Sequence, residues 1–349
     1  MIIILDSIVF SLQKAGGIST YWCNMCVRIL KSPNLIYLIE EEYSGNIEHE
    51  KLLKIKRPIY KSRFTLKPFV RFLNLNTQEI SSKFIFHSSY YRVTKNKFAV
   101  NVVTIHDFIY EKFYSGFRKW LHVYQKSYSI NNADVIITVS NNTKKDLLKY
   151  YPKINPNNVK VVYNGVSEEY FPINKVDSRM SNSILFVGSR EKYKNFDLLV
   201  KILSEIRDYD LIIVGDSLKK NEIFILNKML KNRWKNFTYL SNFELNKLYN
   251  SVFALAYVSS YEGFGIPLIE SMRAGCPFIA LRNSSIIEVA GNAGVLINSL
   301  TATSFISGLM EIKEFREDII QKGLIRSLFF SWDKCYTETL KIYEEYLNE

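Results

Sequence analysis

The strongest constraint on the fold is a repeated alternation of short apolar runs with segments of helical periodicity. The runs of the first half are IIILD, FIFHS, NVVTIH, DVIITVS and VKVVYNG, and those of the second half are ILFVGS, YDLIIVGD, FTYLS, SVFALAYV and PFIALR. Continuously apolar strands that alternate with helices are typical of parallel sheets covered by helices on both faces. The sequence therefore predicts an α/β protein with two doubly wound halves facing each other across a cleft. Such sheets bind ligands beyond the carboxyl ends of their strands.

The length also favours two domains, because 349 residues are more than one hydrophobic core usually serves. The polar segment SEEYFPINKVDSRMSNS separates the two series of runs and has no apolar period. We expect a Rossmann-like domain at residues 1–168, a linker at 169–182 and a second Rossmann-like domain at 183–330. Residues 331–349 are expected to form an amphipathic helix whose aromatic and leucine side chains share one face, namely Trp332, Tyr336, Leu340, Tyr343 and Leu347.

The apolar runs and the cysteines favour a cytoplasmic protein. The longest runs, such as SILFVG, end after about six residues, far short of the roughly 20 that span a bilayer. The first residues, MIIILDSIVF, have no basic start or small-residue cleavage site. The four cysteines are too few and too scattered for a disulfide framework. Cys23 and Cys26 form a C-x-x-C with helical spacing around it, and packing is their favoured role because no second Cys or His pair completes a zinc site.

The net charge of +12 is concentrated in the first half of the chain. Residues 1–170 hold 24 Lys and Arg against 13 Asp and Glu, and the stretch 51–97 carries 12 basic side chains against Glu79 alone. Such a stretch fits a solvated basic surface, an anionic membrane or lipid phosphate, or nucleic acid. The first two alternatives stay open, and nucleic acid is disfavoured because no nucleic-acid-binding motif accompanies the charge.

Two predicted strand-to-helix turns carry glycine and positive charge. In VFSLQKAGGISTYW, Gly16 and Gly17 precede a helix, where missing Cβ atoms and free N–H groups favour an anion. In ILFVGSREKYKNFDLLV, Gly188 ends a strand and is followed by Arg190 and Lys194. A guanidinium fork and an ammonium group at this edge suit a diphosphate, although glycine pairs and surface cations are common in turns without any ligand.

The stretch YEGFGIPLIE places two carboxylates around a glycine-rich turn that leads into a helix. Pro267 fits the first helical turn, so Glu262 lies in the loop ahead of the helix and Glu270 about one turn inside it. Gly263 and Gly265 open the backbone between them. The helix start offers N–H donors to a phosphate, and carboxylates accept hydrogen bonds from sugar hydroxyls. We expect Glu262 to serve a hexose and Glu270 a ribose; the simpler alternative is a helix with an N-terminal acid and a solvated glutamate.

Taken in order, these motifs resemble a known enzyme family. E-G-F-G-x-P-x-x-E, preceded by VVYNGV and VGSREKYKN, looks like the retaining nucleotide-sugar glycosyltransferases of family 4, and GGISTYW, TIHDF and VSNNTKKDL extend the resemblance through the first half. The resemblance covers nearly the whole chain and implies the GT-B fold, with the C-terminal helix crossing back over the first domain. FVGSREKYKNFDLLV and GGIST are most similar to bacterial members that build O-antigen and capsule chains, often mannosyl- or rhamnosyltransferases.

The resemblance implies roles for single residues of the second half. Arg190 and Lys194 match the pair that grips the donor diphosphate, although three residues separate them where many members have four or five. Glu262 matches the acid that contacts the donor sugar, and Glu270 matches the acid that binds the ribose. Backbone groups near the sugar and phosphate are implied at Gly188, after the strand ILFV, and in the loop and helix start between the two acids, at Gly263, Phe264, Gly265 and Ile266.

Other roles implied by the resemblance are carried by the first half and by one later helix. Gly17, with Gly16 beside it, matches a loop glycine near the diphosphate. His106 in VVTIHDF matches the histidine that approaches the donor sugar, and Asp107 would orient His106 or cap the next segment. Glu288 corresponds loosely to a glutamate near the base of the nucleotide.

No metal or other cofactor is expected. Asp208-x-Asp210 superficially resembles a metal-binding D-x-D, but it precedes the strand LIIVG and so falls at the amino end of the sheet. Arg190, Lys194 and the helix N-terminus could neutralise the leaving diphosphate without Mg²⁺ or Mn²⁺.

We therefore predict a retaining, metal-independent glycosyltransferase whose catalytic residues are His106, Arg190, Lys194 and Glu262. It would move a hexose from GDP-mannose or a UDP- or dTDP-sugar to a glycan or lipid-linked acceptor of bacterial surface polysaccharide. Its partners would be the donor, the acceptor and an anionic inner membrane contacted through residues 51–97, at the cytoplasmic face. The alternatives are a nucleotide-sugar epimerase or phosphorylase of the same fold, and a catalytically silent basic protein that binds membrane or nucleic acid.

Overall fold

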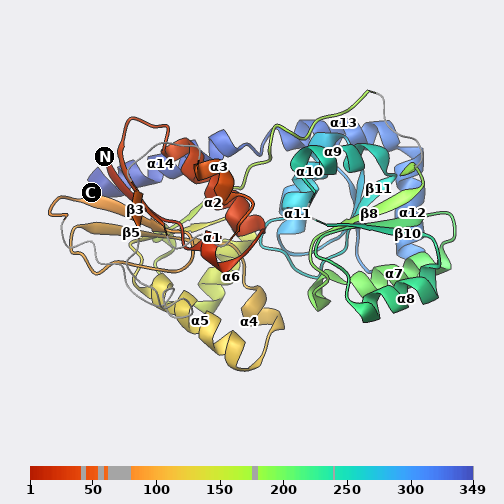
Figure 1. Cartoon of the computed structure of the whole chain (residues 1–349), viewed down its shortest axis with the longest axis horizontal. Helices are drawn as coiled ribbons and strands as arrows, with labels where there is room; N and C mark the ends of the chain where they lie inside the picture. The colour runs from red at the N-terminus through yellow and green to blue at the C-terminus, as the bar shows by residue number, and fades with distance from the viewer. Residues whose placement is uncertain (41–44, 54–58, 62–79, 175–179, 239, 349) are drawn as a thin grey trace. The chain divides into compact units, whose positions relative to one another are not determined.

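The protein consists of two compact units (Figure 1). Unit 1 is Met1–Gly165 together with Trp332–Glu349, and unit 2 is Val166–Ser331. The chain thus enters unit 2 once and returns to unit 1 for its last helix. The computed structural model describes residues 1–40, 45–53, 59–61, 80–174, 180–238 and 240–348.

The described residues of unit 1 form a parallel sheet with the strand order β3-β2-β1-β4-β5-β6-β7. The strands are Ile2–Asp6 (β1), Leu35–Glu40 (β2), Ile59–Lys61 (β3), Phe84–Ser88 (β4), Ala99–Ile105 (β5), Val135–Thr138 (β6) and Val159–Val161 (β7). The first strand pairs with β2 on one side and β4 on the other, so the strand order reverses between β1 and β4. On the two sides of such a reversal, the helices that follow the strands pack on opposite faces of the sheet, and a crevice opens beyond the carboxyl ends of the strands.

Helices cover both faces of this sheet. They are Val9–Leu12 (α1), Gly17–Ile29 (α2), His49–Leu53 (α3), Ile109–Phe113 (α4), Gly116–Asn131 (α5), Asn141–Tyr150 (α6) and Trp332–Asn348 (α14). The main core lies on the face covered by α2 and α14, where Trp22 and Tyr343 meet strand residues such as Ile85. A smaller apolar cluster around Phe84 and Phe86 lies apart from this core.

Unit 2 repeats the arrangement with the strand order β10-β9-β8-β11-β12-β13, again parallel throughout. Its strands are Ser183–Val187 (β8), Asp210–Val214 (β9), Trp234–Phe237 (β10), Ala254–Tyr257 (β11), Phe278–Leu281 (β12) and Val295–Ile297 (β13). Its helices are Phe196–Glu205 (α7), Lys220–Leu230 (α8), Asn242–Ser251 (α9), Ile266–Ala274 (α10), Ser284–Ala290 (α11), Ala302–Glu314 (α12) and Arg316–Ser327 (α13). The predicted fold class, α/β with two doubly wound sheets, is confirmed.

The strand prediction was wrong or incomplete mainly at sheet edges. The strand predicted at FTYLS was misplaced, because β10 comes earlier and shares only Phe237 with it. The prediction also omitted β3 and β13, the outermost strands of their sheets among the described residues, and β2. β10 and the two omitted edge strands have only three or four residues each, too few for an extended apolar run, whereas β2 is an interior strand with the run LIYLIE that the prediction overlooked.

Three further expectations depend on the described part of the chain. No helix there is long and apolar enough to cross a membrane. Cys23 and Cys26 are buried in the core of unit 1, as expected for packing residues. Part of the basic stretch 51–97, on which the predicted membrane contact was based, lies outside the described residues, namely 54–58 and 62–79.

The last helix is held to the sheet of unit 1 by a buried hydrogen-bond network. Nδ1 of His87, at the end of β4, lies 2.5 Å from the hydroxyl of Tyr343 on α14, and Nε2 lies 2.9 Å from Oγ1 of Thr104 on β5. Burial lowers the pKa of His87 to about 3, so the imidazole is neutral and one ring nitrogen must accept while the other donates. Both ring nitrogens are therefore satisfied only when α14 is in place.

Replacing Tyr343 by Phe removes this partner and leaves a ring nitrogen of His87 buried without one. An orphaned buried polar group costs about 1–3 kcal/mol, so we expect Tyr343→Phe to lower the free energy of unfolding by that amount. Urea denaturation of the full chain measures the change. The matched control is Tyr336→Phe, a partly buried position on the same helix, which should change little; equal midpoints for Tyr343→Phe and the wild type would contradict the role of the network.

Candidate functional site

The carboxyl ends of β8 and β11 are neighbours in unit 2, and the strand order reverses between them. Open parallel sheets bind their ligands at such a reversal. The turn after β8 carries Lys194 and leads into α7, and the turn after β11 carries Glu262 and leads into α10. The topology therefore brings together two residues that are far apart in the sequence.

Three hydrogen bonds fasten these two turns to each other. The side-chain amide of Asn195 donates to the carbonyl of Val258 and to Oγ of Ser260, both at 2.8 Å. The backbone N–H of Ser260 donates to the carbonyl of Tyr193 at 2.7 Å. Asn195 adopts a left-handed conformation with φ of 56°, which asparagine tolerates better than most residues, and this turns its amide toward the second loop.

Lys194 and Glu262 form an ion pair within this junction. Nζ of Lys194 donates to a carboxylate oxygen of Glu262 at 2.5 Å, and each side chain is about a tenth exposed. The ammonium group also lies 5.5 Å from the ring centre of Tyr257 and 5.3 Å from that of Tyr193. A cation held between an acid and two aromatic faces is fixed in place, which suits it to bind a ligand phosphate with little further ordering.

The backbone around Glu262 is held from the other side by α11. The N–H of Glu262 donates to Oγ of Ser284 at 3.0 Å, and Oγ of Ser285 donates to the carbonyls of Glu262 and Phe264 at 2.8 and 2.9 Å. Ser284 has a positive φ of 41°, a costly conformation for a residue with a side chain. The serine pair thus fixes the loop that carries Glu262 at the expense of local strain.

The loop ends in the N-terminus of α10. Gly265 is the N-cap with φ of 118°, a conformation that favours glycine, and Pro267 lies in the first turn as predicted. Gly263 and Phe264 precede this cap, and Ile266 is the first helical residue. The first N–H groups of a helix have no partner within it, so this end presents donors and partial positive charge to an anion.

Glu270 lies one turn inside α10 and faces the neighbouring helix α9. The hydroxyl of Tyr249 donates to its carboxyl at 2.9 Å. Burial raises the pKa of Glu270 to about 7, while hydrogen bonds from Tyr249 and Tyr170 pull it the other way. The carboxyl is therefore close to half-ionised near neutral pH.

Arg190 does not join Lys194 and Glu262. Its Nε donates to the carboxylate of Glu222 at 2.8 Å, and its Nη2 donates to the carbonyl of Ser217 at 2.9 Å. Glu222 also accepts the N–H of Lys219 at 2.6 Å and so caps α8. The side chain is only 5% exposed, and its Nη1 is buried with no hydrogen-bond partner among the described residues. Nε and Nη2 of Arg190 are therefore engaged within unit 2, and Nη1 has hydrogen-bonding capacity that the described residues do not use.

Two glycines let the turn after β8 approach the turn after β9 closely. A Cβ on Gly215 would lie 2.5 Å from the carbonyl oxygen of Gly188 and 3.7 Å from Nη1 of Arg190. Gly188 itself has φ of 128°, a conformation that favours glycine. A side chain at Gly215 would therefore clash with the backbone of Gly188 and push the two turns apart, whereas at Gly188 it is the backbone conformation that favours glycine.

The predicted residues of unit 1 lie beyond the carboxyl ends of β1 and β5. Gly16 is the N-cap of α2, and Gly17 is its first residue. His106 follows β5 and stands edge-on to the ring of Tyr21, at 5.0 Å between ring centres. Burial lowers the pKa of His106 to about 3, so its imidazole is neutral at physiological pH. Asp107 accepts the N–H of Ile109 and thereby caps α4, one of its two expected roles.

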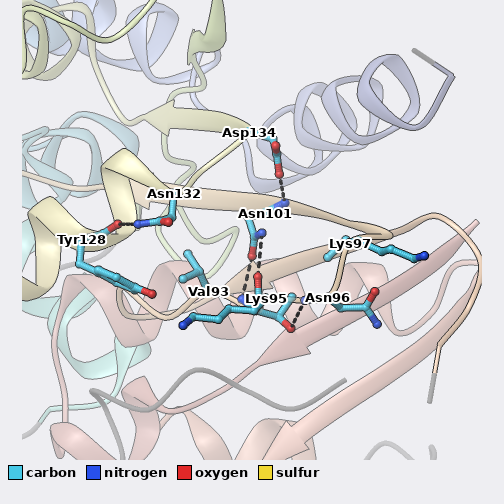
Figure 2. A pocket seen from close by; sticks show the side chains of 10 residues that line it. Val93, Lys95, Asn96, Lys97, Asn101, Tyr128, Asn132 and Asp134 are labelled. Atoms are coloured by element: carbon cyan, nitrogen blue, oxygen red, sulfur yellow. Dashed lines mark hydrogen bonds between the residues drawn. The ribbon is translucent and has the colours of Figure 1, made fainter. Parts of the chain in front are cut away.

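A polar hollow of unit 1 lies at the opposite edge of the sheet (Figure 2). It is lined by residues that include Lys95, Lys97 and Asn132, next to the amino ends of β5 and β6. Asn101 in its wall accepts the N–H of Thr94 and donates its own backbone N–H to Asp134. The polar groups of Asn101 are thus paired within the wall. The hollow lies at the amino ends of the strands, which is not the edge at which parallel sheets bind ligands.

The sequence prediction missed several residues that shape the site. Glu222, Tyr249 and the serine pair of α11 all contact predicted residues, but they belong to other strand-to-helix units and carry no motif of their own.

Glu288 lies on α11, where its carbonyl accepts a hydrogen bond from Arg326 at 2.6 Å. Asp210 is the first residue of β9, at the amino end as expected. Among the described residues no group of three or more His, Cys, Asp or Glu side chains could hold a metal ion.

Comparison with known protein families accounts for this arrangement. A model of group 1 glycosyl transferases matches residues 167–324, and a model of glycosyltransferase family 4 matches residues 15–170. The chain is a GT4-like glycosyltransferase. Curated relatives of this glycosyltransferase include the O-antigen chain mannosyltransferase B of Escherichia coli, 26% identical over 238 residues, and the O-antigen chain mannosyltransferase RfbU of Salmonella typhimurium, 29% identical over 224 residues. Each match covers 62% of this chain and 62% of the relative.

Solved structures show that the glycosyltransferase has the GT-B fold. Anabaena Alr3699/HepE in complex with UDP and glucose superposes with a TM-score of 0.77 at 14% identity, covering 99% of this chain and 100% of that one. WaaG, a glycosyltransferase involved in lipopolysaccharide biosynthesis, superposes with a TM-score of 0.70 at 12% identity, covering 98% and 99%. The predicted family and fold are confirmed.

If Glu270 binds a ribose, as the sequence predicts, its raised pKa makes nucleotide binding depend on pH. A ribose hydroxyl donates to a carboxylate better than to a neutral carboxyl, so affinity should rise as pH increases through 7. Between about pH 6 and about pH 8 we expect a gain of up to about tenfold in UDP or GDP affinity, measured by titration calorimetry. Glu270→Gln, which cannot ionise, should lose this part of the dependence; identical pH profiles for the two proteins would contradict a role for the carboxyl.

A second prediction concerns Glu222, whose substitution should strengthen anion binding. Glu222→Gln keeps the hydrogen-bonding shape but removes a negative charge beside Arg190, so a diphosphate should bind more tightly. Two unit charges about 4 Å apart interact by about 1 kcal/mol in water. Removing the repulsion between Glu222 and a diphosphate therefore predicts about fivefold tighter UDP or GDP binding at low salt. The control is Glu244→Gln, which caps α9 in the same way without an arginine partner. Equal effects of the two substitutions would show that Arg190 is not part of the anion site.

Proposed function

We propose that this protein transfers a hexose from a nucleotide-diphospho-sugar to a glycan or lipid-linked acceptor, with retention of the anomeric configuration. The donor would bind at the carboxyl edge of unit 2. The diphosphate would lie against Lys194, Nη1 of Arg190 and the N-terminus of α10, the sugar near Glu262 and the ribose near Glu270. The assignment of His106 to the donor sugar stays a prediction, carried by its place after β5.

The observation that carries this proposal is the junction of the turns after β8 and β11. It places a fixed ammonium group and a carboxylate next to a glycine-capped helix N-terminus at the reversal of the strand order. The ammonium group and the helix N-terminus suit a phosphate, and the carboxylate accepts hydrogen bonds from sugar hydroxyls. The match to a family of sugar transferases supports the same assignment.

In the proposed reaction the bond between the anomeric carbon and the β-phosphate oxygen breaks, and its electron pair stays on the phosphate. The acceptor oxygen forms the new bond to the anomeric carbon, and its proton passes to the departing phosphate. Lys194 is paired with Glu262 in this structure, so the diphosphate would take over part of its charge on binding. Negative charge on the phosphate grows as the bond breaks, so these cations should stabilise the transition state more than the ground state.

We propose in addition that no metal takes part. Arg190 and Lys194, with the helix N-terminus, supply positive charge where the diphosphate would lie, and this is the role a divalent cation has in other transferases. Titration of donors in the presence of EDTA tests this directly.

The acceptor is proposed from the relatives. Two curated relatives are O-antigen chain mannosyltransferases, and a third acts on a diphospho-undecaprenol-linked sugar, according to their names. A growing chain of bacterial surface polysaccharide, O-antigen or capsule, at the cytoplasmic face of the membrane is therefore the proposed acceptor, and a GDP-mannose, UDP- or dTDP-sugar the proposed donor.

The first test is titration calorimetry of the full chain with EDTA, against UDP, GDP, dTDP and their common sugar conjugates. Selective binding of one nucleotide, lost in Glu270→Ala, would support the donor site and name its base. Absence of binding by all of them would favour a catalytically silent protein.

Turnover tests the catalytic assignment. Arg190→Ala and Lys194→Ala should each lower kcat by about 100-fold or more, as removal of one transition-state charge partner does in other enzymes, with smaller effects on donor affinity. Arg207→Ala removes an exposed arginine at the amino end of β9 and serves as the control. Because Arg190 also braces the β9–α8 turn, Arg190→Lys and a thermal melt separate lost charge from lost structure. Unchanged turnover in a folded Arg190→Ala protein would contradict the assignment.

A further inference from the structure

Lys126 on α5 is a lysine whose charge is fully buried. Its Nζ donates to the carboxylate of Glu111 and to the backbone carbonyl of Asp107, both at 2.9 Å. The ammonium group also lies 4.7 Å from the ring centre of Phe108 and 5.8 Å from that of Tyr91. These partners belong to the turns after β4 and β5 and to α4. The charge of Lys126 is therefore compensated at the ligand edge of the sheet of unit 1.

This ion pair is not the arrangement that stability alone favours. Removing an ammonium group and a carboxylate from water is costly, and the attraction between them often fails to repay that cost. The side chain of Glu111 is only 6% exposed, so water hydrates the pair very little. Apolar side chains of the same volume are often as stable in such a place, or more stable. The placement of Lys126 therefore calls for a role other than the stability of unit 1.

The hydrogen bond to Asp107 fixes the peptide group that directly follows His106. The carboxylate of Asp107 also accepts the N–H of Ile109. This residue is thus held at its carbonyl by α5 and at its side chain by α4, and both restraints act one residue away from His106. Lys126 is close enough to act on the imidazole itself, because its charge assists burial in keeping the pKa of His106 low.

Two other inward residues of α5 brace the same edge of the sheet. Nε2 of Gln125 donates to the carbonyl of Tyr90, in the turn after β4, at 3.4 Å. The ring of His122 stacks on that of Tyr110 on α4, at 3.8 Å between ring centres. The inward face of α5 therefore contacts the segments that follow two adjacent strands, and Lys126 provides the contact nearest to His106.

We propose that Lys126 is a positioning residue that holds His106 in place, through the carbonyl of Asp107, for recognition of the donor sugar. This role rests on the proposed function, in which His106 contacts the sugar of a nucleotide-diphospho-sugar. Lys126 would not touch the substrate, because its ammonium group is buried against the turn after β5. Its removal should weaken recognition of the sugar and leave the binding of the nucleotide by unit 2 unchanged, since misplacement of a contacting group costs only what that group contributes.

The test replaces the ion pair by apolar residues of similar volume, Lys126→Met with Glu111→Leu. We expect this variant to unfold at the same temperature as the wild type or a higher one, because no charge is left buried without a partner. Lys126→Leu with Glu111→Met fills the same space and serves if the first variant does not fold. A clearly lower unfolding temperature for both variants would assign the pair to the stability of unit 1 and overturn the proposal.

The matched control is Lys112→Met with Asp146→Asn. It removes another ion pair of α4, at 3.0 Å, which joins this helix to α6 and not to α5. The control should behave like the wild type in the two measurements that follow.

The position of His106 is measured by nuclear Overhauser effects between its ring and that of Tyr21, whose centres lie 5.0 Å apart. The chain has four histidines, so selectively labelled ring signals can be assigned one by one. We expect the effect in the wild type and its loss or marked weakening in Lys126→Met with Glu111→Leu, because it falls steeply with distance. An unchanged effect in that variant would overturn the proposal. This measurement needs no ligand.

Recognition of the sugar is measured by titration calorimetry of UDP, GDP and dTDP against UDP-glucose, GDP-mannose and dTDP-rhamnose. In Lys126→Met with Glu111→Leu, the affinity for a sugar conjugate relative to its nucleotide should fall by about two- to tenfold, the worth of one hydrogen bond. An unchanged ratio, or an equal loss of both affinities, would contradict the role in sugar recognition. If the wild type binds none of these compounds, the proposed function fails, and the Overhauser effects still decide whether Lys126 positions His106.

Discussion

The hydrogen bonds of Asn195 across the ends of β8 and β11 are the constraint on which the site of unit 2 depends. Parallel strands alone bring their carboxyl ends to the same edge, but they do not fix the loops that follow. The hydrogen bonds of Asn195 join the two turns into one surface. The Lys194–Glu262 ion pair and the glycine N-cap of α10 are both part of that surface. The serine pair of α11 then holds the same loop from the opposite side. Each group of the site is thus supported by an element outside its own strand-to-helix unit.

The two cations of the site are already neutralised in this structure. Lys194 is paired with Glu262, and Arg190 is paired with Glu222. Buried cations without partners would be costly, because the loss of hydration exceeds what weak dipoles return. The acids keep both cations in place while the site is empty, and a bound diphosphate would compete with them. Affinity for such a ligand would be reduced by the cost of that exchange, which in the proposed reaction would favour release of the diphosphate.

The sequence predicted the parts of the fold and site that follow from local patterns, and it missed those that depend on contacts between distant segments. The buried strands, the helix that starts at Pro267 and the turns that carry Lys194 and Glu262 follow from local patterns, and the reversal of strand order then places these turns side by side. The pairing of Arg190 with Glu222 was not predictable, because it depends on how two turns approach over Gly188 and Gly215. Tyr249 beside Glu270 was missed for a similar reason, since it comes from the packing of α9 on α10. Strand β10 was misplaced because edge strands carry little apolar pattern.

The raised pKa of Glu270 has a consequence for the stability of unit 2. In the unfolded chain this carboxyl ionises near 4.5, whereas in the folded unit it ionises only near 7. Below the lower value both states hold the proton and the group contributes nothing. As pH rises from 4.5 through 7 the unfolded chain gains an ionised group that the folded unit cannot hydrate equally well, so folding loses on the order of a few kcal/mol. Above pH 7 the empty unit bears this cost in full. A ligand whose hydroxyls hydrogen-bond to the carboxylate would restore part of the lost stability, so at physiological pH unit 2 is expected to be most stable with such a ligand bound.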